Sequence, residues 1–155
     1  MFLSSNTLLN ACAFAETDKD ARKQNEVVDT AIHNFDLFQS SAPLYGTPDH
    51  LTYGTMLMIF NKQVPSGKLR NKLSKNIFYQ CCHNGQLSGF VVSQLQKAVS
   101  NKILKELFGD AAIFSGKDSI RIDKRKVPRE WHRYGGGLMS KSSRKRSSKQ
   151  QVQRR

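Results

Sequence analysis

The densest group of chemically reactive side chains in this 155-residue chain is Cys81-Cys82-His83. Thiolate and imidazole groups are zinc ligands, but a tetrahedral zinc site requires about four of them. No second Cys/His pair stands at a suitable spacing in the sequence. Neighbouring residues of a helix also point about 100° apart, so Cys81 and Cys82 do not readily face one site. The pattern predicts no metal site and small apolar core residues at both cysteines.

The acidic residues are scattered along the chain and do not form a catalytic cluster. Asp110, Asp118 and Asp123 lie beside a basic run, without a partner group of acids. Gly135-Gly136-Gly137 lacks the strand-turn-helix context that a phosphate-binding loop requires. No nucleophile stands in a recognisable arrangement with a base. We therefore expect a binding module that is not an enzyme and needs no cofactor.

The net charge of +13 is the strongest compositional signal, and it is concentrated at one end. Residues 117–155 hold 14 Lys/Arg and 3 Asp/Glu, whereas residues 1–116 hold 11 and 9. A charge of this size makes a polyanion the expected partner, either nucleic acid or an acidic membrane surface. The split predicts a nearly neutral body, residues 1–109, followed by a basic tail, residues 110–155.

The end of that tail is too polar to fold. Residues 141–155 are Ser, Gln, Lys and Arg with one Val, so they do not bury enough apolar area to offset chain entropy. Lys141, Arg144, Lys145 and Arg146 are candidates for phosphate contacts, each releasing counterions on binding. The same run also fits a solvated, disordered terminus or a nuclear import signal. The sequence does not distinguish among phosphate binding, a disordered terminus and an import signal.

Trp131 is the only tryptophan, and it stands between two arginines. An aromatic ring flanked by Arg129 and Arg133 is a candidate platform for base stacking. Alternatively, the ring folds back onto the last helix pair as a hydrophobic lid, which is the interpretation that we favour.

Apolar residues recur at spacings of three and four over most of the first 109 residues, as in Val28, Ala31, Ile32 and Phe35. Helices this short must pack as antiparallel pairs to be stable. The predicted fold is all-α, although periodicity alone leaves open whether the pairs form a bundle or a solenoid. A brief alternation at Ser119–Asp123 is too short to assign as a strand. The pattern predicts six helices, over about residues 6–16, 20–39, 50–62, 69–82, 87–99 and 103–108.

Signals for membranes and targeting are missing from the sequence. No window approaches 18 continuous apolar residues, so no membrane span is predicted. Secretory and transit peptides normally carry early positive charge, yet no basic residue precedes Lys19. Since the first helical pattern begins without a lead-in, we expect the chain to start inside a longer natural one. An odd number of cysteines predicts reduced thiols in an intracellular compartment.

A short pattern occurs twice. Asn6-Thr7-Leu8-Leu9 is similar to Gly54-Thr55-Met56-Leu57, and the second copy follows Pro48-Asp49. Residues 48–57 read Pro-Asp-His-Leu-Thr-Tyr-Gly-Thr-Met-Leu. This segment resembles the junction between consecutive pentatricopeptide repeats. The resemblance covers residues 4–109. It implies antiparallel helix-turn-helix hairpins that stack as a fragment of an α-solenoid.

Members of that family bind single-stranded RNA, at roughly one nucleotide per repeat. The base is read by a polar residue early in the first helix and by the last residue of the repeat. These positions match Asn6 and Asp49 here, a combination that implies a preference for pyrimidines, especially uracil. The resemblance also implies organellar RNA metabolism, in a mitochondrion or plastid.

Two features depart from the family pattern. Gly54, at the next reading position, has no side chain to bond a base. The 48 residues from Asn6 to Gly54 exceed the usual repeat length of about 35. Helical hairpin repeats also bind proteins in their concave face, so a protein–protein scaffold is the alternative function. Gly54 and the nearly neutral body favour the scaffold, whereas the basic tail and the junction motif favour RNA.

Overall fold

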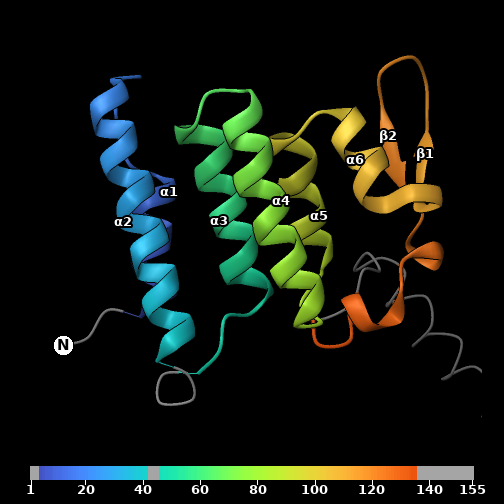
Figure 1. The fold of residues 1–155 in the computed structure, drawn as a ribbon, viewed down its shortest axis with the longest axis horizontal. Coiled ribbons are helices and arrows are strands. Elements are labelled where there is room, and N and C mark those ends of the chain that lie inside the picture. The colour runs from blue at the N-terminus through green and yellow to red at the C-terminus, as the bar shows by residue number, and fades with distance from the viewer. Residues whose placement is uncertain (1–3, 42–45, 136–155) are drawn as a thin grey trace, which may run out of the picture.

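The computed structural model describes residues 4–41 and 46–135 and is mostly helical (Figure 1). The predicted helices are confirmed, with ends that differ by a few residues from those expected. In the described residues they are α1 (Ser5–Ala13), α2 (Ala21–Ser40), α3 (His50–Gln63), α4 (Lys68–His83), α5 (Gly89–Ala98) and α6 (Asn101–Phe108).

Short polar side chains set where several helices begin. Ser4, Asp20 and Ser88 each accept a hydrogen bond from a backbone N–H in the first turn of α1, α2 and α5. Such caps satisfy amide groups that have no partner inside a helix. Because Ser88 caps α5, that helix starts two residues later than the apolar pattern alone predicts.

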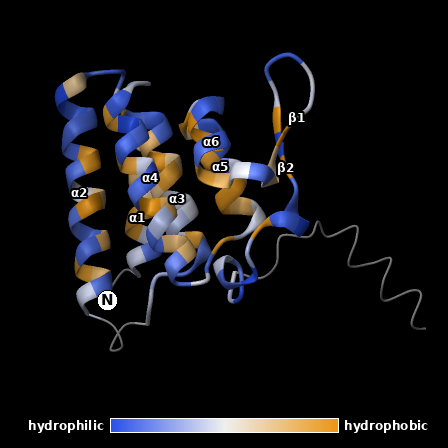
Figure 2. Ribbon diagram, turned by 45° about the vertical axis from the view of Figure 1, so that its right-hand side comes forward, coloured by the Kyte–Doolittle hydropathy of each residue, from blue (hydrophilic) through white to orange (hydrophobic). Residues whose placement is uncertain are grey.

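Helix α3 is the centre of the helical body. It packs against α1, α2, α4 and α5, and nine of its residues are buried. Its apolar residues therefore surround the helix and do not form a single stripe. Figure 2 shows the complementary pattern on α2, whose apolar bands alternate with hydrophilic ones along a helix at the edge of the body. The deepest side chains include Tyr53, Met56 and Phe60.

The expectation of an entirely helical fold is corrected by a small sheet. Strands β1 (Ala112–Phe114) and β2 (Ile120–Ile122) pair antiparallel, with Ile113 opposite Arg121. In β2 the two isoleucines are buried and Arg121 is exposed, so the alternation seen at Ser119–Asp123 belongs to a real strand. Regular structure thus continues past residue 109, the predicted end of the helical body, and also includes short 3-10 turns up to Trp131.

Helix α6 departs from the expected pairing of consecutive helices. Its backbone lies closest to the 3-10 turn η1 (Gly109–Ala111) and the two strands, while its side chains reach α4 through the Phe108–Phe78 ring pair and the Glu106–Lys75 ion pair. Helix α5 packs instead on α3 and α4. Leu104 and Leu107 are buried on the inner side of α6. The fifth and sixth helices therefore do not repeat the close packing of α1 with α2 and of α3 with α4.

The chain after the sheet returns to the start of α5. The Leu87 N–H donates to the Trp131 carbonyl at 2.8 Å, and the Tyr134 N–H donates to the Gly85 carbonyl at 2.7 Å. Gly85 has φ +67°, and a Cβ there would lie 3.0 Å from the Tyr134 ring and 3.1 Å from the Glu130 carbonyl. Both the left-handed backbone and the close approach require glycine at this crossing.

Candidate nucleic-acid interface

The two residues predicted to read a base, Asn6 and Asp49, meet at Thr52. The Thr52 hydroxyl lies 2.8 Å from Asn6 Oδ1 and 3.0 Å from Asp49 Oδ1. Asn6 stands in the first turn of α1 and Asp49 just before α3, so the packing of α1 on α3 joins residues that are far apart in sequence. Both side chains are half-buried, whereas Thr52 is fully buried.

A capping box fixes the position of Asp49. Its side chain accepts from the Thr52 N–H at 3.0 Å, and the Thr52 hydroxyl accepts from the Asp49 N–H at 3.1 Å. This reciprocal pair satisfies two backbone donors at the start of α3. Asp49 therefore has a structural role in addition to its predicted role in binding.

Each of the two side chains keeps one polar atom for a ligand. Among the described residues, Asn6 Nδ2 has no acceptor and Asp49 Oδ2 has no donor. Leu51 follows Asp49 by two residues, in the first turn of α3, and its side chain is 49% exposed. The group thus combines a donor, an acceptor and an apolar side chain near the start of α3.

Gly54 is explained by packing. A Cβ at this position would overlap the ring of Phe90 of α5, at Cε1 and Cδ1. Glycine is therefore required for α3 and α5 to approach each other. The half-buried Phe90 ring occupies the space into which any side chain at position 54 would extend. The sequence showed that position 54 lacks a side chain but did not show why.

Trp131 folds back on the helical body as a lid, but onto α4 and the end of α6 and not onto the pair formed by the fifth and sixth helices. Its ring packs edge to face on Phe78, with centroids 5.5 Å apart, and lies 6.3 Å from Phe108. The side chain is half-buried against α4 and the end of α6. The contacts with two phenylalanines account for its position without a nucleic-acid base.

The four tail residues proposed for phosphate contacts, Lys141, Arg144, Lys145 and Arg146, lie outside the described residues. Two basic surfaces within residues 46–135 were not singled out from the sequence. One is a cavity beside β2 with Arg121 and Lys124 on its wall. The other is a groove on α4 that contains Lys68, Lys72 and Lys75. The cavity depends on the approach of β2 to α5, which no local pattern encodes. The lysines of the groove instead follow helical spacing along α4, a signal that the sequence does carry.

The cysteines are buried in the core, as predicted. Burial raises the pKa of the Cys81 thiol far above its usual value and that of Cys82 to about 12. The described part of the chain has no group of three or more His, Cys, Asp or Glu side chains placed to hold a metal ion. Within that same part, no helix is both long and apolar enough to cross a membrane.

Comparisons with known proteins identified no relative of this chain. The sequence matches no known protein-family model, and neither a curated protein nor a solved structure matches it significantly.

Proposed function

We propose that this chain binds single-stranded RNA as a helical repeat module without catalytic activity. The observation that carries the proposal is the convergence of Asn6 and Asp49 on Thr52. An amide donor and a carboxylate acceptor held at a half-buried site complement the polar edge of a nucleobase. The basic C-terminal segment supplies the attraction to phosphates.

The repeat architecture is part of the same proposal. We treat α1 with α2, and α3 with α4, as two consecutive helical hairpins, with α5 opening an incomplete third. The packing of α3 between α1 and α5 supports this reading, because the first helix of each hairpin then contacts the next. Stacked hairpins of this kind present one row of first-turn residues along a common surface.

The test is binding of the full chain to fluorescently labelled oligouridine and oligoadenine RNA. Asp49→Ser keeps a capping oxygen but removes the carboxylate. We expect it to weaken uridine-rich RNA binding by about fivefold or more, in line with the loss of a hydrogen bond to a charged group. Asn6→Ala is expected to act in the same direction. Equal affinity of Asp49→Ser and the parent chain would contradict the proposed reading of bases.

Asp20→Ser is the matched control. Asp20 caps α2 with the same chemistry, by accepting from Arg22 N at 2.9 Å, but lies outside the Asn6–Thr52 group. It is expected to leave RNA affinity unchanged. A loss common to both serine variants would indicate that helix stability, and not base reading, is being measured.

The tail is tested separately by replacing Lys141, Arg144, Lys145 and Arg146 with Gln in the full chain. Each phosphate contact on a single strand contributes a slope of about 0.7 in log affinity against log salt. We expect the quadruple variant to bind with a shallower salt dependence. An unchanged slope would remove the tail from the interface.

A second candidate function is binding of an acidic, partly apolar protein segment. The groove of about 520 Å³ on α4 supports it, since it is lined by Lys72 and by Tyr79, which is 54% exposed. Leu69, also on α4, is 61% exposed. Such a partner would be released by Lys72→Glu and unaffected by Asp49→Ser, which separates the two functions.

A further inference from the structure

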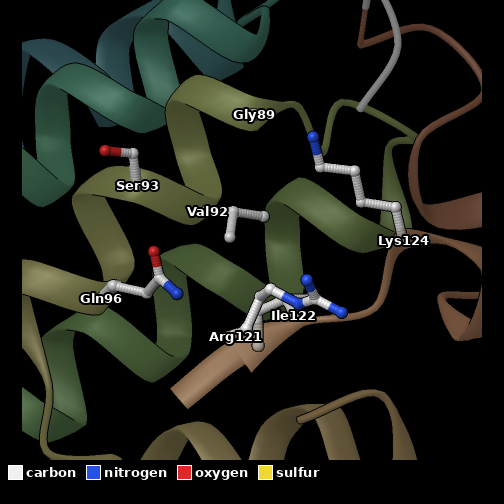
Figure 3. A pocket seen from close by; sticks show the side chains of 7 residues that line it. All are labelled: Gly89, Val92, Ser93, Gln96, Arg121, Ile122 and Lys124. Carbon is white, nitrogen blue, oxygen red and sulfur yellow. The ribbon is translucent and has the colours of Figure 1, made fainter. Parts of the chain in front are cut away.

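A cavity of about 230 Å³ lies where β2 passes α5, away from the Asn6–Thr52 group (Figure 3). Figure 3 shows Val92 at its centre, with Arg121 and Lys124 on one side and Ser93 and Gln96 on the other. The cations come from β2 and the turn after it, and the uncharged side chains come from α5. Two segments distant in sequence therefore build one site.

Both cations of this cavity are exposed, and within the described residues no carboxylate pairs with either of them. Asp123, between the two cations in sequence, is engaged elsewhere: it accepts from the Arg125 N–H at 3.1 Å and lies 3.5 Å from Arg125 Nε. Across residues 4–41 and 46–135, neither Arg121 nor Lys124 has a carboxylate oxygen within 4.0 Å. Two unpaired cations on one wall favour an anionic group between them.

The opposite wall suits a flat group with polar edges. Gln96 Nε2 donates to the Ile120 carbonyl at 3.1 Å, which holds the amide and leaves Oε1 to accept from a ligand. The Ser93 hydroxyl can both donate and accept. Val92 is half-buried and Ile122 is buried beneath the opening, so they offer an apolar floor.

We propose that this cavity is a nucleotide-binding site, filled by one nucleotide of a single-stranded RNA. The phosphate lies between Arg121 and Lys124, and the base rests on Val92 with its edge toward Gln96. A phosphate alone would leave the apolar floor exposed, and an apolar group alone would leave two cations unpaired. The inference rests on the proposed function for the source of the nucleotide, and its chemistry is tested independently.

The first measurement is a titration of the isotopically labelled full chain with uridine 5′-monophosphate, uridine and inorganic phosphate. Backbone amide shifts of Ser93, Gln96 and Arg121 report on the cavity. We expect the monophosphate to bind about tenfold more tightly than either fragment, because it uses both walls. Equal affinity for inorganic phosphate and the monophosphate, or shifts confined to other residues, would overturn the assignment.

Gly89 provides a charge probe that spares the binding side chains. It is the first residue of α5 on the rim of the cavity, and a Cβ there has no atom within 4 Å. Gly89→Glu adds a carboxylate beside the cations without a clash. Ala21→Glu is the control, since it adds the same charge at the first residue of α2. We expect Gly89→Glu to weaken monophosphate binding at least about tenfold and Ala21→Glu to leave it unchanged.

Parallel RNA titrations separate this inference from the proposed function. If RNA binds and Gly89→Glu affects neither RNA nor the monophosphate, the cavity assignment is wrong and the function stands. If the monophosphate binds in the cavity while oligomeric RNA does not bind, the nucleotide site stands, RNA is overturned as the source of the nucleotide, and the proposed function falls. Loss of both ligands in Gly89→Glu, with Ala21→Glu intact, supports the two together.

Discussion

The ring of Phe90 covers Gly54 so closely that a single methyl group on Gly54 would overlap it. The contact joins the middle of α3 to the first turn of α5, across the most extensive helix–helix interface of the described structure. It explains why position 54 carries glycine where the similar stretch at Asn6–Leu9 carries asparagine. Space at this point is taken by an aromatic side chain that arrives from elsewhere in the chain.

Gly54→Ala is therefore expected to destabilise the fold, although alanine is the better helix former. Overpacking of a tight core costs about 1–3 kcal/mol, which exceeds the gain of about 1 kcal/mol from helix propensity. Urea unfolding followed by circular dichroism measures the difference. Gly89→Ala is the control, because its Cβ meets open space and no loss is expected. In a Phe90→Ala background the cost of Gly54→Ala should disappear; persistence there would refute the packing account.

Thr52→Val removes a buried hydroxyl and leaves its partners in place. The Asp49 N–H then loses its acceptor, and Asn6 Oδ1 loses its neighbour at the α1–α3 contact. Leaving such groups unsatisfied costs about 1–3 kcal/mol, which thermal unfolding would detect as a lower midpoint. Thr30→Val is the control, since Thr30 is exposed and donates only to the Glu26 carbonyl. Equal effects of the two substitutions would contradict a special role for Thr52.

Trp131→Ala is expected to lower stability by about 2 kcal/mol or more, because it opens the contact with Phe78 and Phe108. Trp131→Phe, which keeps an aromatic ring, should recover most of the loss. Phe114→Ala serves as the control at a side chain that is 62% exposed. As the only tryptophan, Trp131 also reports directly by fluorescence. Strong quenching by added RNA would identify it as a stacking platform after all.

The buried thiols predict a specific response to alkaline pH. The pKa of Cys82 is raised by burial from 9.0 in the unfolded chain to about 12, so its stabilising contribution is complete below about pH 9 and is lost as pH rises toward 12. The urea midpoint should therefore fall between pH 8 and pH 10.5, and less steeply in Cys82→Ala. Disulfide reagents at pH 8 should modify Cys81 and Cys82 only after unfolding. Rapid labelling of the folded chain would contradict their burial.

The helices were predictable because their signals are local. The stripe that includes Val28, Ala31 and Phe35 gave α2, and the Asp49 cap placed the start of α3 at residue 50. The small sheet escaped because three residues per strand carry too little alternation to outweigh chance. The placement of α6 escaped for a different reason: it depends on tertiary contacts with β1, β2 and α4, which no local pattern carries.

The candidate site likewise has a part that was predicted from the sequence and a part that was not. Asn6 and Asp49 were found through a short motif, and the structure brings them together at Thr52. The cavity with Arg121 and Lys124 could not be predicted from the sequence, because nothing there separates these two cations from the others of the basic segment. What distinguishes them is the engagement of Asp123 with Arg125 and the approach of β2 to α5. Neither follows from composition or spacing.

The return of the chain to the start of α5 has a consequence for how the molecule can be opened. Two main-chain hydrogen bonds, from Leu87 to Trp131 and from Tyr134 to Gly85, join the two ends of the segment that contains α5, α6 and the sheet. The segment thus forms a closed loop without a covalent bond between its ends. Such a closed unit unfolds cooperatively instead of fraying from one side. The exposed bend between β1 and β2, around Gly116, lies at the far end of that loop. A protease cut or an inserted peptide there leaves both halves held in place, which makes this bend the natural point for a new terminus.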